Sequence, residues 1–237
     1  MYSTLPWELR DRIHTFCVQG SYDNEVVVRR TIGDKTALFV RQPAGAQSYH
    51  WTEDPIFLDL SSGQIGAVET KELFGAYYWV RTFKFAHREL DLLQTFLEND
   101  ELRLGVCPAN HVRRLHLQLQ PFTYGQLHET KARDREVKRC CRALEALTTV
   151  RKPCTAIQIH VDVAQGGIDH ENYEYAVADA ARFILQIVEV VSKLRSNGLK
   201  IEMIFEGTWC GETGLKLCSR SVSSLDDCIS QMKIACQ

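Results

Sequence analysis

The residues of this sequence that could do chemistry are histidines, amides and carboxylates that occupy every second position of three separate segments. They are His116 and Gln118, then Gln158, His160 and Asp162, and finally Glu202 and Glu206. A histidine beside a carboxylate can be oriented and tuned for proton transfer near neutral pH, and a glutamine can donate a hydrogen bond to a carbonyl or a developing oxyanion. We therefore expect His116, His160 and Asp162 to be catalytic and the other four residues to bind a ligand, in acid/base or cyclisation chemistry without a cofactor.

Motif searches point away from cofactor and metal chemistry. The sequence has no GxGxxG, Walker A, GxSxG, HExxH or EF-hand pattern. Its nine cysteines include no CxxC pair, and Cys210, Cys218 and His170 match no established ligand spacing. We expect no cofactor and no metal, and we expect Cys210 and Cys218 to be buried free thiols. The odd, unpatterned set of cysteines is typical of a reducing compartment.

Three strands and three helices that alternate along the C-terminal part would position these polar residues. Connections long enough for a helix imply parallel strands joined by right-handed crossovers. Within each strand apolar residues alternate with mostly polar ones, so one face packs on helices and the other meets water, a ligand or another layer. The sequence predicts an α/β fold, a parallel sheet of repeated strand-helix units with helices on one face. The expected strands are Val112–Gln120, Thr155–Val163 and Lys200–Glu206, and the expected helices are Arg133–Thr149, Tyr173–Ser196 and Leu225–Ala235.

The N-terminal part predicts a smaller annex to this core, within one domain over residues 1–237. Residues 1–41 are expected to form a helix and a β-hairpin that turns at Gly33. Residues 42–66 are rich in turn-forming residues and predict a long loop, with at most a short strand at Ile56–Leu60, that could serve as a lid. The core spans residues 67–237. It begins with a helix at Glu69–Val80, a strand at Thr82–Phe85 and a helix at His87–Asn99.

Three stretches of the chain resemble uncharacterised ascomycete proteins that have an F-box-like start. They are Leu5–Ile13 with the pattern LPxELRxxI, Arg81–Phe85 and Pro108–Leu115. The resemblance implies a Skp1-type partner and work as a ubiquitin-ligase adaptor, with Leu5, Pro6, Leu9 and Ile13 binding the partner. The alternative interpretation is that Leu5, Leu9, Ile13 and Phe16 pack this helix onto the sheet.

Two functions of different classes remain. The first is a cofactor-independent small-molecule pocket protein, such as a fungal biosynthetic isomerase or cyclase, in which aromatic residues including Trp51 and Tyr78 roof the polar face and bind the ligand. The second is an F-box-like protein-interaction adaptor without catalysis. The polar face could also be solvated or contact a protein, because its residue types are common on the open face of a sheet.

Composition and charge limit the expected partners. The chain has 237 residues, of which 45% are hydrophobic and 24% charged, and its net charge of -2 offers no general attraction for nucleic acid or an anionic membrane. One helix carries a basic stripe without the interleaved exposed aromatics of a nucleic-acid site. We expect a cytoplasmic or nuclear protein with neither partner, since the sequence has no secretory signal and no apolar run of about eighteen residues. The basic residues are Lys131, Arg133, Arg135, Lys138, Arg139 and Arg142.

Overall fold

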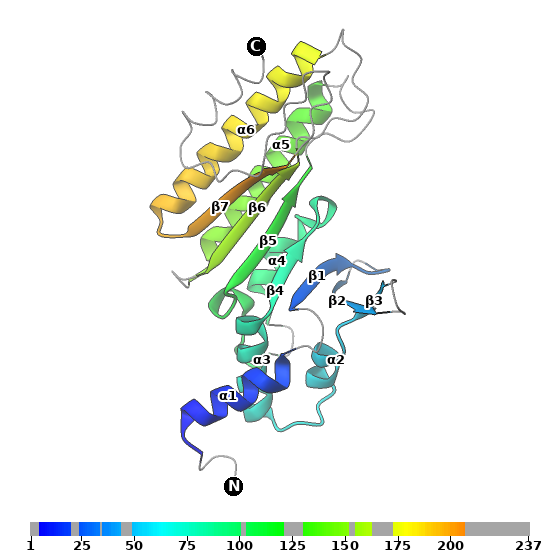
Figure 1. Cartoon of the computed structure of the whole chain (residues 1–237), viewed down its shortest axis with the longest axis vertical. Helices are drawn as coiled ribbons and strands as arrows, with labels where there is room; N and C mark the ends of the chain where they lie inside the picture. The colour runs from blue at the N-terminus through cyan, green and yellow to red at the C-terminus, as the bar shows by residue number, and fades with distance from the viewer. Residues whose placement is uncertain are drawn as a thin grey trace. The chain divides into compact units, whose positions relative to one another are not determined.

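The structure is a computed structural model that describes residues 5–19, 24–33, 35–43, 49–100, 103–120, 130–151, 155–162 and 173–206. Within these ranges the chain forms seven strands and six α-helices (Figure 1). The strands form one mixed sheet in the order β3-β2-β1-β4-β5-β6-β7. The predicted α/β class is confirmed at this level.

Two compact units divide the chain. The first comprises Met1–Leu115 with Thr149–Thr155, and the second comprises His116–Thr148 with Ala156–Gln237. Strand β5 (Arg114–Leu119) starts in the first unit and continues in the second. The expectation of one domain stays a prediction.

The sheet of the first unit combines a parallel pair with an antiparallel extension. β1 (Glu25–Arg30) pairs in parallel with β4 (Thr82–Phe85) and antiparallel with β2 (Thr36–Pro43). β2 pairs antiparallel with β3 (Tyr49–Glu53). Gly33, in the turn between β1 and β2, has φ +93°, a conformation that favours glycine, so the predicted hairpin is confirmed.

The core of the first unit is rich in aromatic rings. Its helices are α1 (Trp7–Val18), α2 (Pro55–Ser61), α3 (Ala67–Val80) and α4 (Leu92–Glu98). Neighbouring rings have centroids 5.0 to 6.4 Å apart, mostly edge to face or tilted, as aromatic side chains prefer. The rings are those of Phe57, Phe74, Tyr77, Tyr78, Phe83, Phe85 and Phe96.

The segment predicted as a long loop, residues 42–66, contains both β3 and α2, so that prediction is wrong. The short strand expected at Ile56–Leu60 is also wrong, because these residues lie in α2. Asp54 caps this helix by accepting a hydrogen bond from the backbone N–H of Ile56 at 2.9 Å, and Pro55 occupies its first turn. An Asp-Pro pair is a helix-start signal that outweighed the scattered apolar pattern.

The single helix predicted at His87–Asn99 is divided in the structure. A short 3₁₀ helix spans His87–Glu89, and α4 follows it. The helix predicted at Leu225–Ala235 lies outside the described residues.

The second unit contains the two-faced strands that the sequence predicts. α5 (Thr130–Glu145) precedes β6 (Ala156–Asp162), and α6 (Tyr173–Ser196) leads into β7 (Lys200–Glu206), which pairs with β6 in parallel. Figure 1 shows α5 and α6 side by side. The apolar face is buried and the opposite face is partly exposed, so the alternation is confirmed. The buried side chains are Leu117, Leu119, Ile157, Ile159, Val161, Ile201 and Met203.

Among the described residues, no helix is both long and apolar enough to cross a bilayer.

Candidate functional site

A chain of hydrogen bonds crosses the polar face of the second unit. The Nε2 of His116 on β5 is bonded to the Oε1 of Gln158 on β6. The Nε2 of Gln158 donates to the Oε2 of Glu202 on β7 at 2.9 Å. Gln158 and Glu202 are direct neighbours in the β6–β7 register. Since an amide oxygen only accepts, His116 is the donor and carries a proton on Nε2.

A second histidine lies against the first. The rings of His116 and His160 are 5.0 Å apart and nearly perpendicular, at 80°. Both side chains are half-buried, and His160 is directly opposite Ile204 in the β6–β7 register. The two imidazoles therefore form a compact pair beside one apolar residue, as the sequence predicts for side chains at matching height on neighbouring strands.

The remaining predicted residues of this face are placed only in part. Gln118 is half-buried on the same face of β5 as His116. Asp162 and Glu206 are opposite each other in the β6–β7 register, but their side chains lie outside the part that the structure describes. Asp162 as a catalytic residue and Glu206 as a ligand-binding residue stay predictions.

This arrangement suits proton transfer. The carboxylate of Glu202 is hydrogen-bonded to the amide of Gln158, and that amide is hydrogen-bonded to the imidazole of His116. Hydrogen bonds of this kind fix the orientation and tautomer of a catalytic histidine. With the proton on Nε2, the lone pair of His116 is on Nδ1, which is shielded from solvent and would have to open to a substrate before it acts as a base. We name His116, Gln158, Glu202 and His160 the polar-face cluster.

The structure places the two aromatic residues predicted to roof this face, Tyr78 and Trp51, among other residues of the first unit. Tyr78 is buried in the core of the first unit, beside Phe74, Phe83 and Phe96. It lines a cavity of about 20 Å³, which has roughly the space of one water molecule. Trp51 is on β3 with the guanidinium of Arg29 4.8 Å from its ring centroid. A ligand role for Trp51 or Tyr78 stays a prediction.

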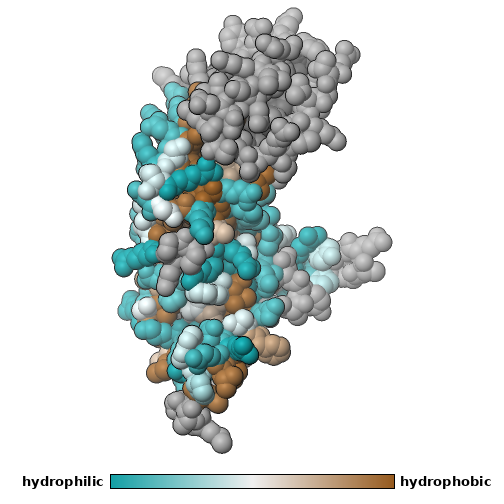
Figure 2. Space-filling view, turned by 60° about the vertical axis from the view of Figure 1, so that its left-hand side comes forward, coloured by the Kyte–Doolittle hydropathy of each residue, from teal (hydrophilic) through white to brown (hydrophobic). Residues whose placement is uncertain are grey.

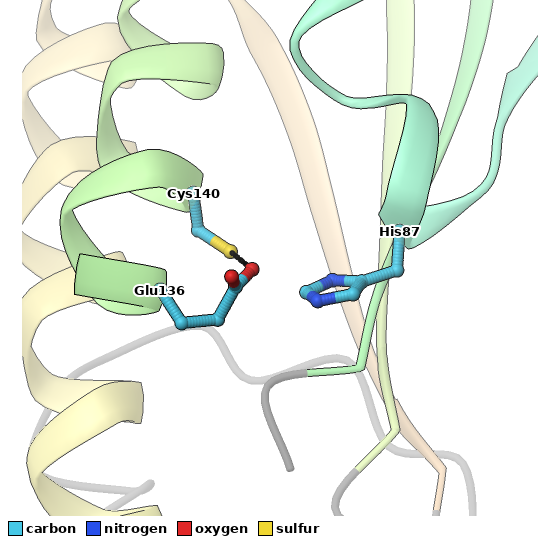
Figure 3. A group of neighbouring side chains, drawn as sticks. All are labelled: His87, Glu136 and Cys140. Atoms are coloured by element: carbon cyan, nitrogen blue, oxygen red, sulfur yellow. Dashed lines mark hydrogen bonds between the residues drawn. The ribbon is translucent and has the colours of Figure 1, made fainter. Parts of the chain in front are cut away.

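Cys140 on α5 combines a thiol with a neighbouring carboxylate. Its Sγ is 3.7 Å from the Oε1 of Glu136, one turn earlier, and donates to it (Figure 3). Burial and then the charge of Glu136 raise the pKa of the Cys140 thiol to about 12. The thiolate is the form that attacks or binds metal, so Cys140 stays a neutral thiol near neutral pH.

The cysteines of the described residues are free, but their burial differs. Cys140 is buried, whereas Cys107 and Cys141 are half-buried and Cys17 is exposed. Cys210, Cys218 and His170 lie outside the described residues.

An apolar stripe on the N-terminal helix is a second candidate site. Leu9, Ile13 and Phe16 follow the helical repeat along α1 and are 46%, 39% and 80% exposed. Leu5 is half-buried, and Pro6 and Trp7 are exposed. Figure 2 shows hydrophobic surface at the lower end of the view, where Figure 1 places α1. The interpretation that this stripe packs the helix onto the sheet is wrong.

Polar contacts hold the opposite side of α1. The Nη1 of Arg10 is 2.8 Å from the Oε1 of Glu72 on α3, and the Nε2 of buried His14 is 3.6 Å from its Oε2. Val18 is buried on the same side of the helix. Because the inner side uses Arg10, His14 and Val18, the apolar stripe faces away from α3.

Comparison with protein-family models, curated proteins and solved structures returns no match to this chain.

Proposed function

We propose that this protein is an interaction adaptor that docks a protein partner through the apolar stripe of α1. The observation that carries the proposal is the exposure of Leu9, Ile13 and Phe16, which turn apolar side chains toward solvent while Arg10 and His14 face inward. Exposed apolar side chains at helical spacing are the anchors by which an amphipathic helix enters a groove. The LPxELRxxI pattern of this helix makes a Skp1-type protein the first partner to test.

A double substitution tests the stripe. Leu9→Ala with Ile13→Ala removes apolar area that is already exposed in the free protein, so we expect the variant to keep its stability. Loss of both anchors should weaken binding to the Skp1-type protein about thirtyfold, equivalent to about 2 kcal/mol. Isothermal titration with the full chain measures the effect.

A matched control exists elsewhere on the surface. Leu58 on α2 and Leu185 on α6 are 48% and 38% exposed, close to the values for Leu9 and Ile13. The double variant Leu58→Ala with Leu185→Ala should bind like the unaltered protein. Equal weakening by both double variants, or no heat of binding at any concentration that titration can reach, would contradict the proposal.

The polar-face cluster supports a second candidate function, a small-molecule protein that performs cofactor-free acid/base chemistry. The observation in its favour is the hydrogen-bonded chain from Glu202 through Gln158 to His116, with His160 alongside. Isomerisation and cyclisation are the reaction types that a positioned imidazole base would serve.

The base can be tested without knowing the substrate. Nitrobenzisoxazole opens its ring when a base removes one proton, and the product absorbs light. We expect the protein to accelerate this reaction more than free imidazole does, and His116→Ala or His160→Ala to remove the acceleration. His50→Ala, at an exposed histidine on β3, is the control. Acceleration that survives in both variants would exclude the polar-face cluster as the base.

A further inference from the structure

Strands β1, β2 and β3 present an aromatic and cationic surface that the sequence-based predictions did not contain. The register places Phe39, Arg41 and Pro43 of β2 on one face with Trp51 and Tyr49 of β3. Arg29 of β1, opposite Ala37, shares this face. The other face contains Val26, Val28, Leu38 and Val40, which are all buried. We name Arg29, Phe39, Arg41, Tyr49 and Trp51 the aromatic-cationic face.

Each arginine of this face lies over an aromatic ring. The guanidinium carbon of Arg41 is 3.8 Å from the ring centroid of Tyr49. That of Arg29 is 4.8 Å from the ring of Trp51 and 5.8 Å from the ring of Phe39. Arg29 is opposite Ala37 in the β1–β2 register, and its side chain extends along the face past the ring of Phe39 to reach Trp51. These contacts fix the orientation of both guanidinium groups on the surface before any ligand binds.

The charge of the face is not balanced. Lys84, on the same face of β4, is 3.8 Å from Glu25 and is neutralised by it. Glu53 shares the face, opposite Phe39. Among the described residues, however, neither Arg29 nor Arg41 has a carboxylate oxygen within 4.0 Å. Two guanidiniums over aromatic rings, with one unpaired carboxylate between them, leave a local positive charge on a chain whose net charge is -2.

We propose that the aromatic-cationic face binds single-stranded nucleic acid. Trp51 and Tyr49 would stack bases, and Arg29 and Arg41 would contact phosphates. An open sheet face with aromatic rings beside cations is how many single-strand-binding proteins work, because every base has a π-face and every nucleotide a phosphate. Tyr49 and Trp51 are about 7 Å apart along β3, the spacing of alternate residues on one face of a strand.

A protein partner is the competing occupant. Trp, Tyr and Arg are also common in protein interfaces. Two guanidiniums with no carboxylate nearby in the described part of the chain favour nucleic acid, because a polypeptide would need acidic and aromatic side chains in matched alternation to satisfy both groups. Single-stranded nucleic acid supplies an anion and a planar ring in every unit. RNA and DNA share this chemistry, and the experiment separates them.

Fluorescence anisotropy of labelled oligouridylate and oligothymidylate, each about 16 nucleotides long, tests the proposal with the full chain. We expect saturable binding in the micromolar range for at least one of the two. Trp51→Ala should weaken binding about tenfold without changing its salt dependence, because stacking involves no ion release. Arg41→Ala should reduce the slope of log affinity against log salt by about 0.7, the value for one phosphate contact on a single strand.

Matched controls come from other surfaces of the chain. Trp79 on α3 is 50% exposed and lies under Arg113, much as Trp51 is 44% exposed and lies under Arg29. Lys193 on α6 is an exposed cation. Trp79→Ala and Lys193→Ala should change the affinity less than twofold. If Trp51→Ala loses its folded circular-dichroism spectrum, Tyr49→Ala at the end of the edge strand replaces it.

Three results would overturn the proposal. One is the absence of any anisotropy change up to about 100 µM protein, the weak end of non-specific binding. Another is an equal loss of affinity in Trp51→Ala and Trp79→Ala. The last is displacement of the oligonucleotide by polyglutamate as effectively as by unlabelled oligonucleotide, which would assign the face to an acidic polypeptide. Preference for oligouridylate over oligothymidylate would identify RNA as the ligand.

Discussion

At the scale of single residues, the buried Asp54 has three partners, and no motif in the sequence points to them. One of its carboxylate oxygens caps α2 at Ile56, and the other accepts a hydrogen bond from the hydroxyl of Tyr77 at 2.7 Å. The guanidinium of Arg81 is 3.9 Å away. All three side chains, Asp54, Tyr77 and Arg81, are buried. A buried charge is tolerated only when it is paired and hydrogen-bonded.

Asp54→Ala should destabilise the protein by about 4 kcal/mol, since it removes a helix cap, the acceptor of the buried Tyr77 hydroxyl and a carboxylate beside the buried Arg81. Urea unfolding followed by circular dichroism measures the free energy of unfolding. Asp59→Ala, at an exposed position in α2, is the control and should cost less than about 0.5 kcal/mol. Similar losses in the two variants would show that the buried contacts of Asp54 contribute little.

At the scale of elements, one acidic residue of α3 binds two side chains of α1. Glu72 contacts both Arg10 and His14, while the apolar stripe of the helix faces away. Of the residues of α1 only His14 and Val18 are buried, and a helix with few buried apolar side chains opens more easily than the core. The apolar stripe is therefore displayed on an element whose attachment is largely polar.

Glu72→Ala should loosen α1 without unfolding the sheet. We expect a loss of about 1 kcal/mol in the local opening free energy, which corresponds to roughly fivefold faster amide exchange in α1. Hydrogen exchange read by mass spectrometry resolves α1 from the strands. Glu98→Ala, at an exposed glutamate on α4, should leave exchange in α1 unchanged. Faster exchange across the whole first unit would mean that Glu72 supports the core instead.

At the scale of the whole molecule, both compact units contain a buried group that resists ionisation. Burial and then the charge of Asp54 raise the pKa of Tyr77 in the first unit well above its ordinary value. In the second unit, burial and the charge of Glu136 raise the pKa of Cys140 to about 12. Each group binds its proton more tightly in the folded protein than in the unfolded chain.

The protein should therefore lose stability at alkaline pH. The contribution of Cys140 is fully present below about pH 9, the ordinary value for a thiol, and is lost as the pH rises toward about 12. Tyr77 acts in the same direction above its own ordinary value. Urea unfolding across this range should show a falling free energy of unfolding, and Cys140→Ala should reduce the fall. Cys17→Ala, at an exposed thiol, should leave it unchanged.

The sequence by itself determined the local features that depend on residue spacing. Alternation of period two placed Leu117, Ile159 and Met203 on a buried face and His116 and His160 on the opposite one, because side chains of a strand point alternately to its two sides. The turn at Gly33 was likewise readable, because its φ of +93° favours glycine. Helix α2 was missed although Asp54-Pro55 is a start signal, because the surrounding residues have the composition of a loop.

Only the tertiary structure decided which surfaces meet and which stay open. The apolar stripe of α1 is predictable as a stripe, but Glu72 lies far along the chain, and its pairing with Arg10 and His14 turned the stripe outward. The aromatic-cationic face required the β2–β3 register, which sets Arg41 opposite Trp51. The link from His116 through Gln158 to Glu202 required strand pairing too. Pairing between distant segments is set by the packing of the whole chain, and no local pattern encodes it.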